Sequence, residues 1–147
     1  MAMTEAPGSF LSQLNKGTNL PEIRREITQE KINLYAEASG DFNPIHVDES
    51  FAKGTSLGGT VAHGMLILAY VSHMMTATFG ENWLERGKLE VRFRTPARKG
   101  DIVTISGRVV RLEQNGEESL VECDILCQNH KGEVVITGEA SVGVKKE

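Results

Sequence analysis

The second half of the chain alternates between apolar and polar residues in four stretches, separated by short polar breaks. A period of two is typical of strands, and breaks such as Asn115-Gly116 and Lys131-Gly132 are typical of tight turns. Long strands joined by short turns form an antiparallel sheet. The pattern therefore predicts four such strands, over residues 88–95, 102–112, 119–129 and 134–144.

The first half of the chain predicts the remaining elements. Residues 63–79 are apolar almost all round, with no proline and few charges, which indicates a helix buried on most of its surface. Residues 20–27 alternate loosely and predict a fifth strand, and Thr28 could cap a short helix over residues 29–38. Residues 39–60 contain a proline and several glycines and predict an ordered excursion, which in a small domain is usually functional.

Together these elements predict an α+β fold. A single apolar helix is buried only if the sheet of about five strands wraps around it, so a strongly curved antiparallel sheet around one central helix fits the pattern best. The chain has 147 residues, the usual size of one domain. Residues 1–19 are rich in glycine, serine and threonine and weakly patterned, so we expect a mobile lead-in before a single domain over residues 20–147.

Charge and composition exclude several classes of function. The formal net charge is −4, so no overall basic field draws the protein to nucleic acid or to an anionic membrane. No apolar run approaches the roughly 20 residues that span a bilayer, and the N-terminus lacks the pattern of a secretory signal, which predicts a cytoplasmic protein. Cys123 and Cys127 would share a strand face too far apart to bridge, which predicts two buried, reduced thiols.

Candidate chemistry begins with an acid and an imidazole five positions apart. Asp41 and His46 flank a segment stiffened by Pro44, and Asn43 could fix this loop through side chain to backbone hydrogen bonds. A carboxylate can take a proton from water while an imidazole orients that water or exchanges a proton with carbon, as hydration of a double bond requires. Each residue alone would be interpreted as a turn or loop residue, but their combination favours the catalytic interpretation.

The start of the apolar helix supplies a second candidate. Free backbone N–H groups and the positive end of the helix dipole are found there, and Gly64 has no side chain to block close approach. Hydration of an enoyl thioester places negative charge on the thioester oxygen, which the Gly64 N–H could stabilise. The alternative is a glycine that allows close packing of helix on sheet. His63, beside it, is interpreted as structural.

Two further interpretations concern polar residues near these positions. Ser72 lies further along the apolar helix, where a lone polar side chain usually bonds to the backbone. Asp41, His46, Asp48 and His63 could be metal ligands, but their spacing matches no established zinc signature and no cysteine joins them. The sequence therefore predicts neither a metal nor another cofactor.

The same residues resemble the hydratase motif of the MaoC-like hydratases, which are hot-dog-fold (R)-specific enoyl-CoA hydratases. The likeness runs from Tyr35 through Ser39-Gly40-Asp41-x-Asn43-Pro44-x-His46 to Ala52, and then through His63-Gly64-Met65 to the helix and strands that follow. It covers the chain from about residue 20 onwards.

This resemblance implies a hot-dog fold in which residues 39–60 form an overhang across an acyl-CoA substrate. It implies that Asp41 and His46 act on the catalytic water and that the Gly64 N–H binds the thioester oxygen. It also implies that Asn43 and Ser72 support the site, and we place His63 with these supporting residues. The expected products are (R)-3-hydroxyacyl thioesters, and the expected assembly is a homodimer whose sheets join side by side.

Other functions remain as alternatives. A dehydratase of acyl-carrier-protein thioesters, or of a specialised acyl-CoA, would share the chemistry and differ in the carrier or the acyl group. A noncatalytic acyl-thioester binding domain is possible on fold alone, and the Asp41 and His46 pair disfavours it. A hot-dog thioesterase also needs a carboxylate but would release free thiol.

One basic stretch suits the phosphates of coenzyme A, because guanidinium groups bind phosphate well. Solvated strand and turn charges explain the same stretch equally well, so it is not included in the predicted site. It consists of Arg92, Arg94, Arg98 and Lys99.

Overall fold

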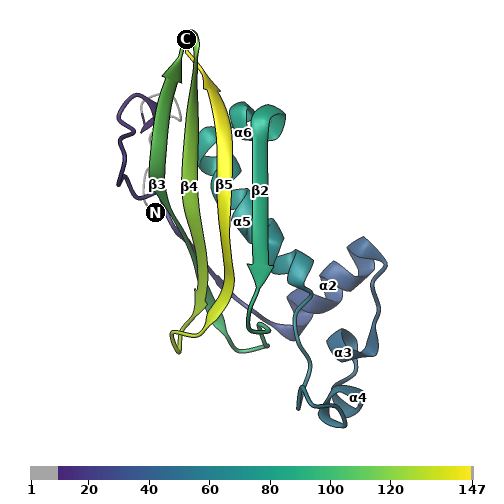
Figure 1. Cartoon of the computed structure of the whole chain (residues 1–147). Coiled ribbons are helices and arrows are strands. Elements are labelled where there is room, and N and C mark those ends of the chain that lie inside the picture. The colour runs from purple at the N-terminus through teal and green to yellow at the C-terminus, as the bar shows by residue number, and fades with distance from the viewer. Residues whose placement is uncertain (1–9, 147) are drawn as a thin grey trace.

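The computed structural model describes residues 10–146 and shows a five-stranded antiparallel sheet curled around one long helix (Figure 1). The strand order is β1-β3-β4-β5-β2, which confirms the predicted α+β, hot-dog arrangement. The strands are β1 (Ile23–Glu26), β2 (Gly87–Phe93), β3 (Ile102–Asn115), β4 (Glu118–Asn129) and β5 (Val134–Lys145). The helices are α2 (Gln29–Ser39), α3 (Pro44–Val47), α4 (Glu49–Lys53), α5 (Gly64–Phe79) and α6 (Glu81–Arg86).

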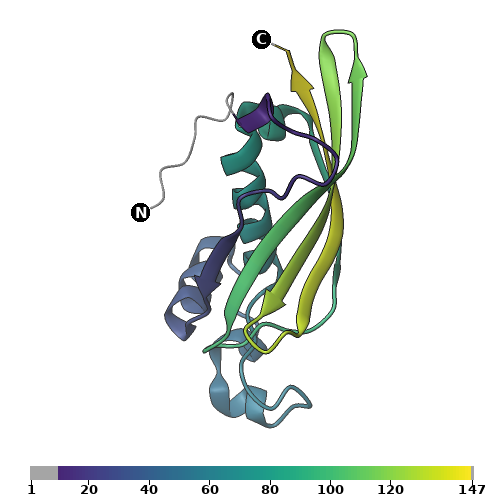
Figure 2. The same cartoon turned by 90° about the vertical axis from the view of Figure 1, so that its left-hand side faces the viewer.

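The three longest strands, β3, β4 and β5, form a meander. They pair along nearly their whole lengths, and Gly116 in the β3–β4 turn adopts a φ of 64°, which glycine accepts without strain. The register shifts between Val109 and Arg111 on β3, and an irregularity of this kind increases the local twist. The sheet therefore bends around the helix, as the side view shows (Figure 2).

The concave face of the sheet and α5 form the core. Alternate residues of β4 are buried, and α5 buries residues on most of its circumference, in agreement with the two hydrophobic patterns. At Gly107 of β3 a Cβ would lie 2.8 Å from Leu20 Cδ1 and 3.2 Å from Met74 Cε. The helix can approach the sheet this closely because position 107 has no side chain.

The predicted excursion is ordered and carries two short helices, α3 and α4, which lie with α2 at one end of the sheet (Figure 1). Thr28 caps α2 as predicted, because its Oγ1 accepts a hydrogen bond from the Lys31 N–H at 3.1 Å. The chain leaves the excursion at Val61, whose N–H donates to the Ile45 carbonyl at 3.0 Å. The excursion thus ends beside the start of α5.

Residues 10–19, predicted to form a lead-in, make contacts with the sheet. Leu14 is buried, the Gly17 N–H donates to the Val109 carbonyl at 2.7 Å, and Asn19 forms a bridge with Arg108. These residues follow the sheet with few side chains facing the core, which explains their weak pattern. Residues 1–9 of the predicted lead-in lie outside the described residues.

The short helix α6 was not predicted. Its six residues follow α5 directly after Gly80 and are too few to show a helical period, although Trp83 is buried. Across residues 10–146, no helix has both the length and the apolar character needed to cross a bilayer.

Candidate active site

A chain of local hydrogen bonds shapes the loop that carries Asp41. Gly40 ends α2 with a φ of 78°, and the Asp41 N–H donates to Ser39 Oγ at 3.2 Å. Asp41 Oδ1 accepts from the Asn43 N–H, and Asn43 Oδ1 accepts from the Ile45 N–H, each at 3.2 Å. Asn43 therefore caps α3 and fixes the loop through a side chain to backbone hydrogen bond, as predicted from its position.

His46 is buried, and its ring orientation is fixed by the backbone. Its Nδ1 lies 2.7 Å from the Val61 carbonyl, which can only accept, so Nδ1 carries the proton. In the neutral ring the lone pair is then on Nε2, which lies 3.9 Å from Asp41 Oδ2. This separation is too long for a direct hydrogen bond, and it suits a water molecule placed off the line between the two atoms.

His63 connects the two parts of the site. Its Nε2 donates to the Asp41 carbonyl at 2.9 Å, and its ring stacks on His46 with centroids 3.8 Å apart and planes 25° apart. The Tyr35 ring covers it at 4.8 Å. His63 Nδ1 is buried and has no hydrogen-bond partner among the described residues. His63 also directly precedes α5, so one residue contacts Asp41 and His46 and lies at the start of the helix.

Gly64 is the first residue of α5 and is exposed. In the described part of the chain its N–H has no acceptor, as expected in the first turn of a helix. A Cβ at this position would lie 3.0 Å from Phe93 Cε1, so the Phe93 ring forms a wall directly beside the N–H. A hollow of about 300 Å³ adjoins them, and its lining includes Val61, Ile67 and Val135.

The donor atoms of Asp41, His46 and His63 lie within 4.8 Å of one another, close enough to consider a metal ion. The two imidazoles are stacked, however, so their in-plane lone pairs run side by side and do not converge on one point. Backbone carbonyls engage His46 Nδ1 and His63 Nε2, so a metal ion would have to bind His46 Nε2 and His63 Nδ1, which lie in the two stacked ring planes. The geometry suits a shared water better than a metal.

Ser72 lies apart from this group. It is eight residues beyond Gly64, about 12 Å along the helix, and its Oγ accepts a hydrogen bond from Trp83 Nε1 at 3.2 Å. Its supporting role in the site stays a prediction.

The basic stretch does not act as one patch. Lys99 Nζ is paired with Glu49 Oε2 at 3.0 Å, and the Arg98 N–H donates to Asp101 Oδ2 within the turn. Arg94 Nε donates to Thr137 Oγ1 at 3.2 Å, and together with Arg92 it borders a hollow on the outer face of the sheet. The explanation as a turn charge therefore accounts for Lys99, whose ammonium group is paired.

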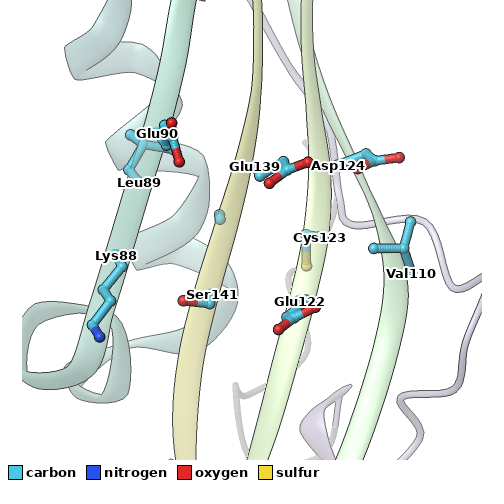
Figure 3. A pocket seen from close by; sticks show the side chains of 10 residues that line it. Lys88, Leu89, Glu90, Val110, Glu122, Cys123, Asp124, Glu139 and Ser141 are labelled. Atoms are coloured by element: carbon cyan, nitrogen blue, oxygen red, sulfur yellow. The ribbon is translucent and has the colours of Figure 1, made fainter.

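A second hollow, of about 450 Å³, lies on the same outer face (Figure 3). It contains carboxylates on neighbouring strands, since Glu139 of β5 is opposite both Glu90 of β2 and Asp124 of β4. No histidine lines it, so it lacks the pairing of acid and imidazole found at Asp41.

Three contributors to the site could not be found from the sequence. The Val61 carbonyl is a backbone group that any residue would offer, and Phe93 comes from a strand 29 positions beyond Gly64. Gln29, whose Nε2 donates to the His46 carbonyl at 2.8 Å, gave no signal beyond its place at the start of a helix.

Comparison with known proteins places these residues in a family. The model of the family described as MaoC like domain matches residues 12–129. The chain is 33% identical over 129 residues to 3-hydroxybutyryl-CoA dehydratase of Methylorubrum extorquens, covering 85% of this chain and 78% of that protein. It is 33% identical over 122 residues to (R)-specific enoyl-CoA hydratase of Rhodospirillum rubrum, covering 83% of each. Its fold is similar to that of R-hydratase PhaJ1 from Pseudomonas aeruginosa in the unliganded form, with a TM-score of 0.79, 26% identity, and coverage of 92% and 85%.

Proposed function

Because this chain belongs to the MaoC-like domain family, we propose that it hydrates trans-2-enoyl-CoA to (R)-3-hydroxyacyl-CoA and catalyses the reverse dehydration. The protein is a hydro-lyase of acyl thioesters, as its relatives are named hydratases and dehydratases. The enoyl-CoA substrate and the (R) configuration are the proposal. The observation that carries it is the approach of Asp41 Oδ2 to His46 Nε2 at 3.9 Å, with the ring held by the bond from Nδ1 to the Val61 carbonyl.

In this mechanism Asp41 and His46 hold the attacking water between two acceptors. One of them takes a proton from the water as its oxygen bonds to the β-carbon of the enoyl group. The electron pair of the double bond moves toward the thioester oxygen, and the same proton is then returned to the α-carbon. The sum is the addition of one water, and no cofactor is required.

The Gly64 N–H is the proposed donor to the thioester oxygen. An unengaged N–H at the first turn of a sixteen-residue helix favours negative charge, which develops on that oxygen in the enolate-like state. The apolar hollow beside Gly64 and Phe93 suits the acyl group, which has no hydrogen bonds to make.

A homodimer is also proposed. Among residues 10–146, β2 is an edge strand that pairs only with β5, so its other side carries unpaired backbone N–H and C=O groups. Phe93 and Met65, near the end of this edge, are more than half exposed. Pairing with β2 of a second copy would satisfy the backbone groups and cover the two side chains. Sedimentation equilibrium should give twice the mass of one chain. A monomer at assay concentrations would contradict the proposed homodimer.

The deciding experiment follows the loss of absorbance of the conjugated thioester when the protein meets crotonyl-CoA. Asp41→Asn and His46→Ala should each lower kcat by at least about 100-fold, because each removes one of the two groups on the water. Asp124→Asn on the outer face and His73→Ala on the exposed side of α5 are matched controls and should retain activity. The product should be (R)-3-hydroxybutyryl-CoA.

The same assay separates the alternatives. Turnover with acyl-carrier-protein thioesters and none with any enoyl-CoA would assign the carrier-protein dehydratase. Release of free thiol from a saturated acyl-CoA would assign a thioesterase. Binding of thioesters without either reaction would leave a noncatalytic binding domain.

A further inference from the structure

The start of α2 and the middle and end of the excursion meet at three polar side chains. Thr60 is 2% exposed, and its Oγ1 lies 2.8 Å from Gln29 Oε1 and 2.9 Å from Glu49 Oε2. The Thr60 N–H donates to the same Glu49 oxygen at 3.3 Å. Lys99 Nζ, from the turn before β3, donates to it at 3.0 Å. Gln29, Glu49, Thr60 and Lys99 thus form one connected network, which we call the excursion clamp.

The excursion clamp reaches the backbone of His46 through Gln29. His46 lies in the last turn of α3, a four-residue helix whose final carbonyls have no partners within the helix. Gln29 Nε2 donates to the His46 carbonyl at 2.8 Å and so satisfies one of them. The second hydrogen of this amide goes to Asn33 Oδ1 at 2.9 Å, which holds the amide in one orientation.

The excursion clamp reaches the ring of His46 through the residue after Thr60. The Val61 carbonyl accepts from His46 Nδ1 at 2.7 Å, while the Val61 N–H donates to the Ile45 carbonyl at 3.0 Å. Any shift of the Thr60 backbone therefore displaces the acceptor that sets the His46 tautomer. Two neighbours of the Thr60 hydroxyl therefore hold His46: the Gln29 amide binds its carbonyl, and the Val61 carbonyl binds its ring.

We infer that the excursion clamp positions His46 for the hydration reaction, which makes Gln29, Glu49 and Thr60 positioning residues. The inference rests on the function proposed above. None of the three lines the hollow beside Gly64, so each acts through His46 and touches no substrate.

Charge strengthens the excursion clamp. The one proton of the Thr60 hydroxyl is shared between two acceptors, Gln29 Oε1 and the Glu49 carboxylate. The hydrogen bond from Lys99, with those from Thr60, lowers the pKa of Glu49 to about 2, so Glu49 is ionised at neutral pH. An ionised Glu49 accepts from both the N–H and the hydroxyl of Thr60 and so holds the backbone that leads to Val61.

The test compares variants that remove one functional group while keeping the shape of the side chain. Thr60→Val deletes the hydroxyl, Thr60→Ser keeps it, and Gln29→Glu removes the donor to the His46 carbonyl while keeping a residue favoured at a helix start. With crotonyl-CoA, kcat should fall about tenfold or more in Thr60→Val and Gln29→Glu with little change in KM, because misplacement of a catalytic group costs rate. Thr60→Ser should recover most of it. Thr104→Val and Gln114→Glu on β3 are matched controls and should keep the wild-type kcat.

A second readout does not depend on turnover. Nitrogen-15 spectra of histidine should show His46 as the Nδ1–H tautomer in the wild type and in Thr60→Ser, and a mixture of tautomers in Thr60→Val. An unchanged tautomer in Thr60→Val together with an unchanged kcat would overturn the inference, as would a loss of kcat that merely follows a lower thermal midpoint. If the wild type turns over no thioester, the proposed function fails, while the tautomer of His46 still decides whether the excursion clamp positions it.

Discussion

At the scale of single residues, Gly64 allows the oxyanion role to be tested by adding one methyl group. Alanine is a better helix former than glycine, and the Phe93 ring that the methyl would meet at 3.0 Å is more than half exposed and can move. Gly64→Ala should therefore leave the thermal midpoint nearly unchanged. It should lower kcat with crotonyl-CoA by about 10- to 100-fold, because the methyl group crowds the approach of the thioester oxygen to the N–H.

Phe93 provides the control for this prediction. Phe93→Leu makes room for the methyl group without touching the backbone donor. If Gly64→Ala acted only by displacing the Phe93 ring, the double variant would recover the activity, and such a recovery would contradict the oxyanion role.

The two thiols give a prediction about reactivity. Burial raises the pKa of Cys123 to about 12, with a smaller contribution from the charge of Asp124, and burial alone raises the pKa of Cys127 to about 12. A thiol reacts as its thiolate, so iodoacetamide at about pH 8 should leave both unmodified in the folded protein and modify both in urea. Mass spectrometry after a timed quench measures this, and rapid native modification of either residue would contradict the burial.

The candidate catalytic residues could be predicted from the sequence because they lie within one local segment and one helix start. Asp41, Asn43 and His46 are brought together by a turn and a four-residue helix, which local spacing indicates. The Val61 carbonyl and Phe93 reach the site through tertiary packing between distant segments, and no pattern along the chain encodes that.

At the scale of elements, the excursion should loosen in acid. The pKa of Glu49 is about 2 in the folded protein and 4.5 ordinarily, so its contribution to stability is fully present above about pH 4.5 and is lost as the pH falls toward about 2. The thermal midpoint of the wild type should exceed that of Glu49→Gln near neutral pH, and the difference should shrink through this window. Lys99→Met, which removes the main cause of the shift, should lower the neutral midpoint in the same direction. A difference that stays constant down to pH 2 would contradict this prediction.

The longer elements could be predicted more reliably than the short ones. α5 and the strands β3, β4 and β5 run for a dozen residues or more, so their periods are evident, and their observed bounds lie within a few residues of the predicted ones. α3 and α6 have four and six residues, and their positions depend on contacts such as the burial of Trp83. Residues 10–19 hold to the sheet partly through backbone hydrogen bonds, which do not depend on side-chain pattern.

At the scale of the whole molecule, the outer face of the sheet is a place where stability can be gained. Glu139 lies between Glu90 and Asp124 on the neighbouring strands, and like charges directly opposite each other destabilise a sheet. Glu139→Lys should raise the free energy of unfolding by about 0.5 kcal/mol in urea titrations. Glu117→Lys, in the exposed β3–β4 turn, is the matched control, and an equal gain there would show a general effect of net charge instead.

These three carboxylates and the Lys99–Glu49 pair imply that dissolved salt acts on the sheet and on the excursion in opposite senses. Raising ionic strength from about 10 mM to about 150 mM shortens the Debye length from about 30 Å to about 8 Å. Repulsion across β2, β5 and β4 then weakens, so amide hydrogens of the sheet should exchange more slowly. The attraction of Lys99 for Glu49 weakens as well, so amides of the excursion should exchange faster. The salt concentration of the medium would thus change the local stabilities of the sheet and of the excursion in opposite directions.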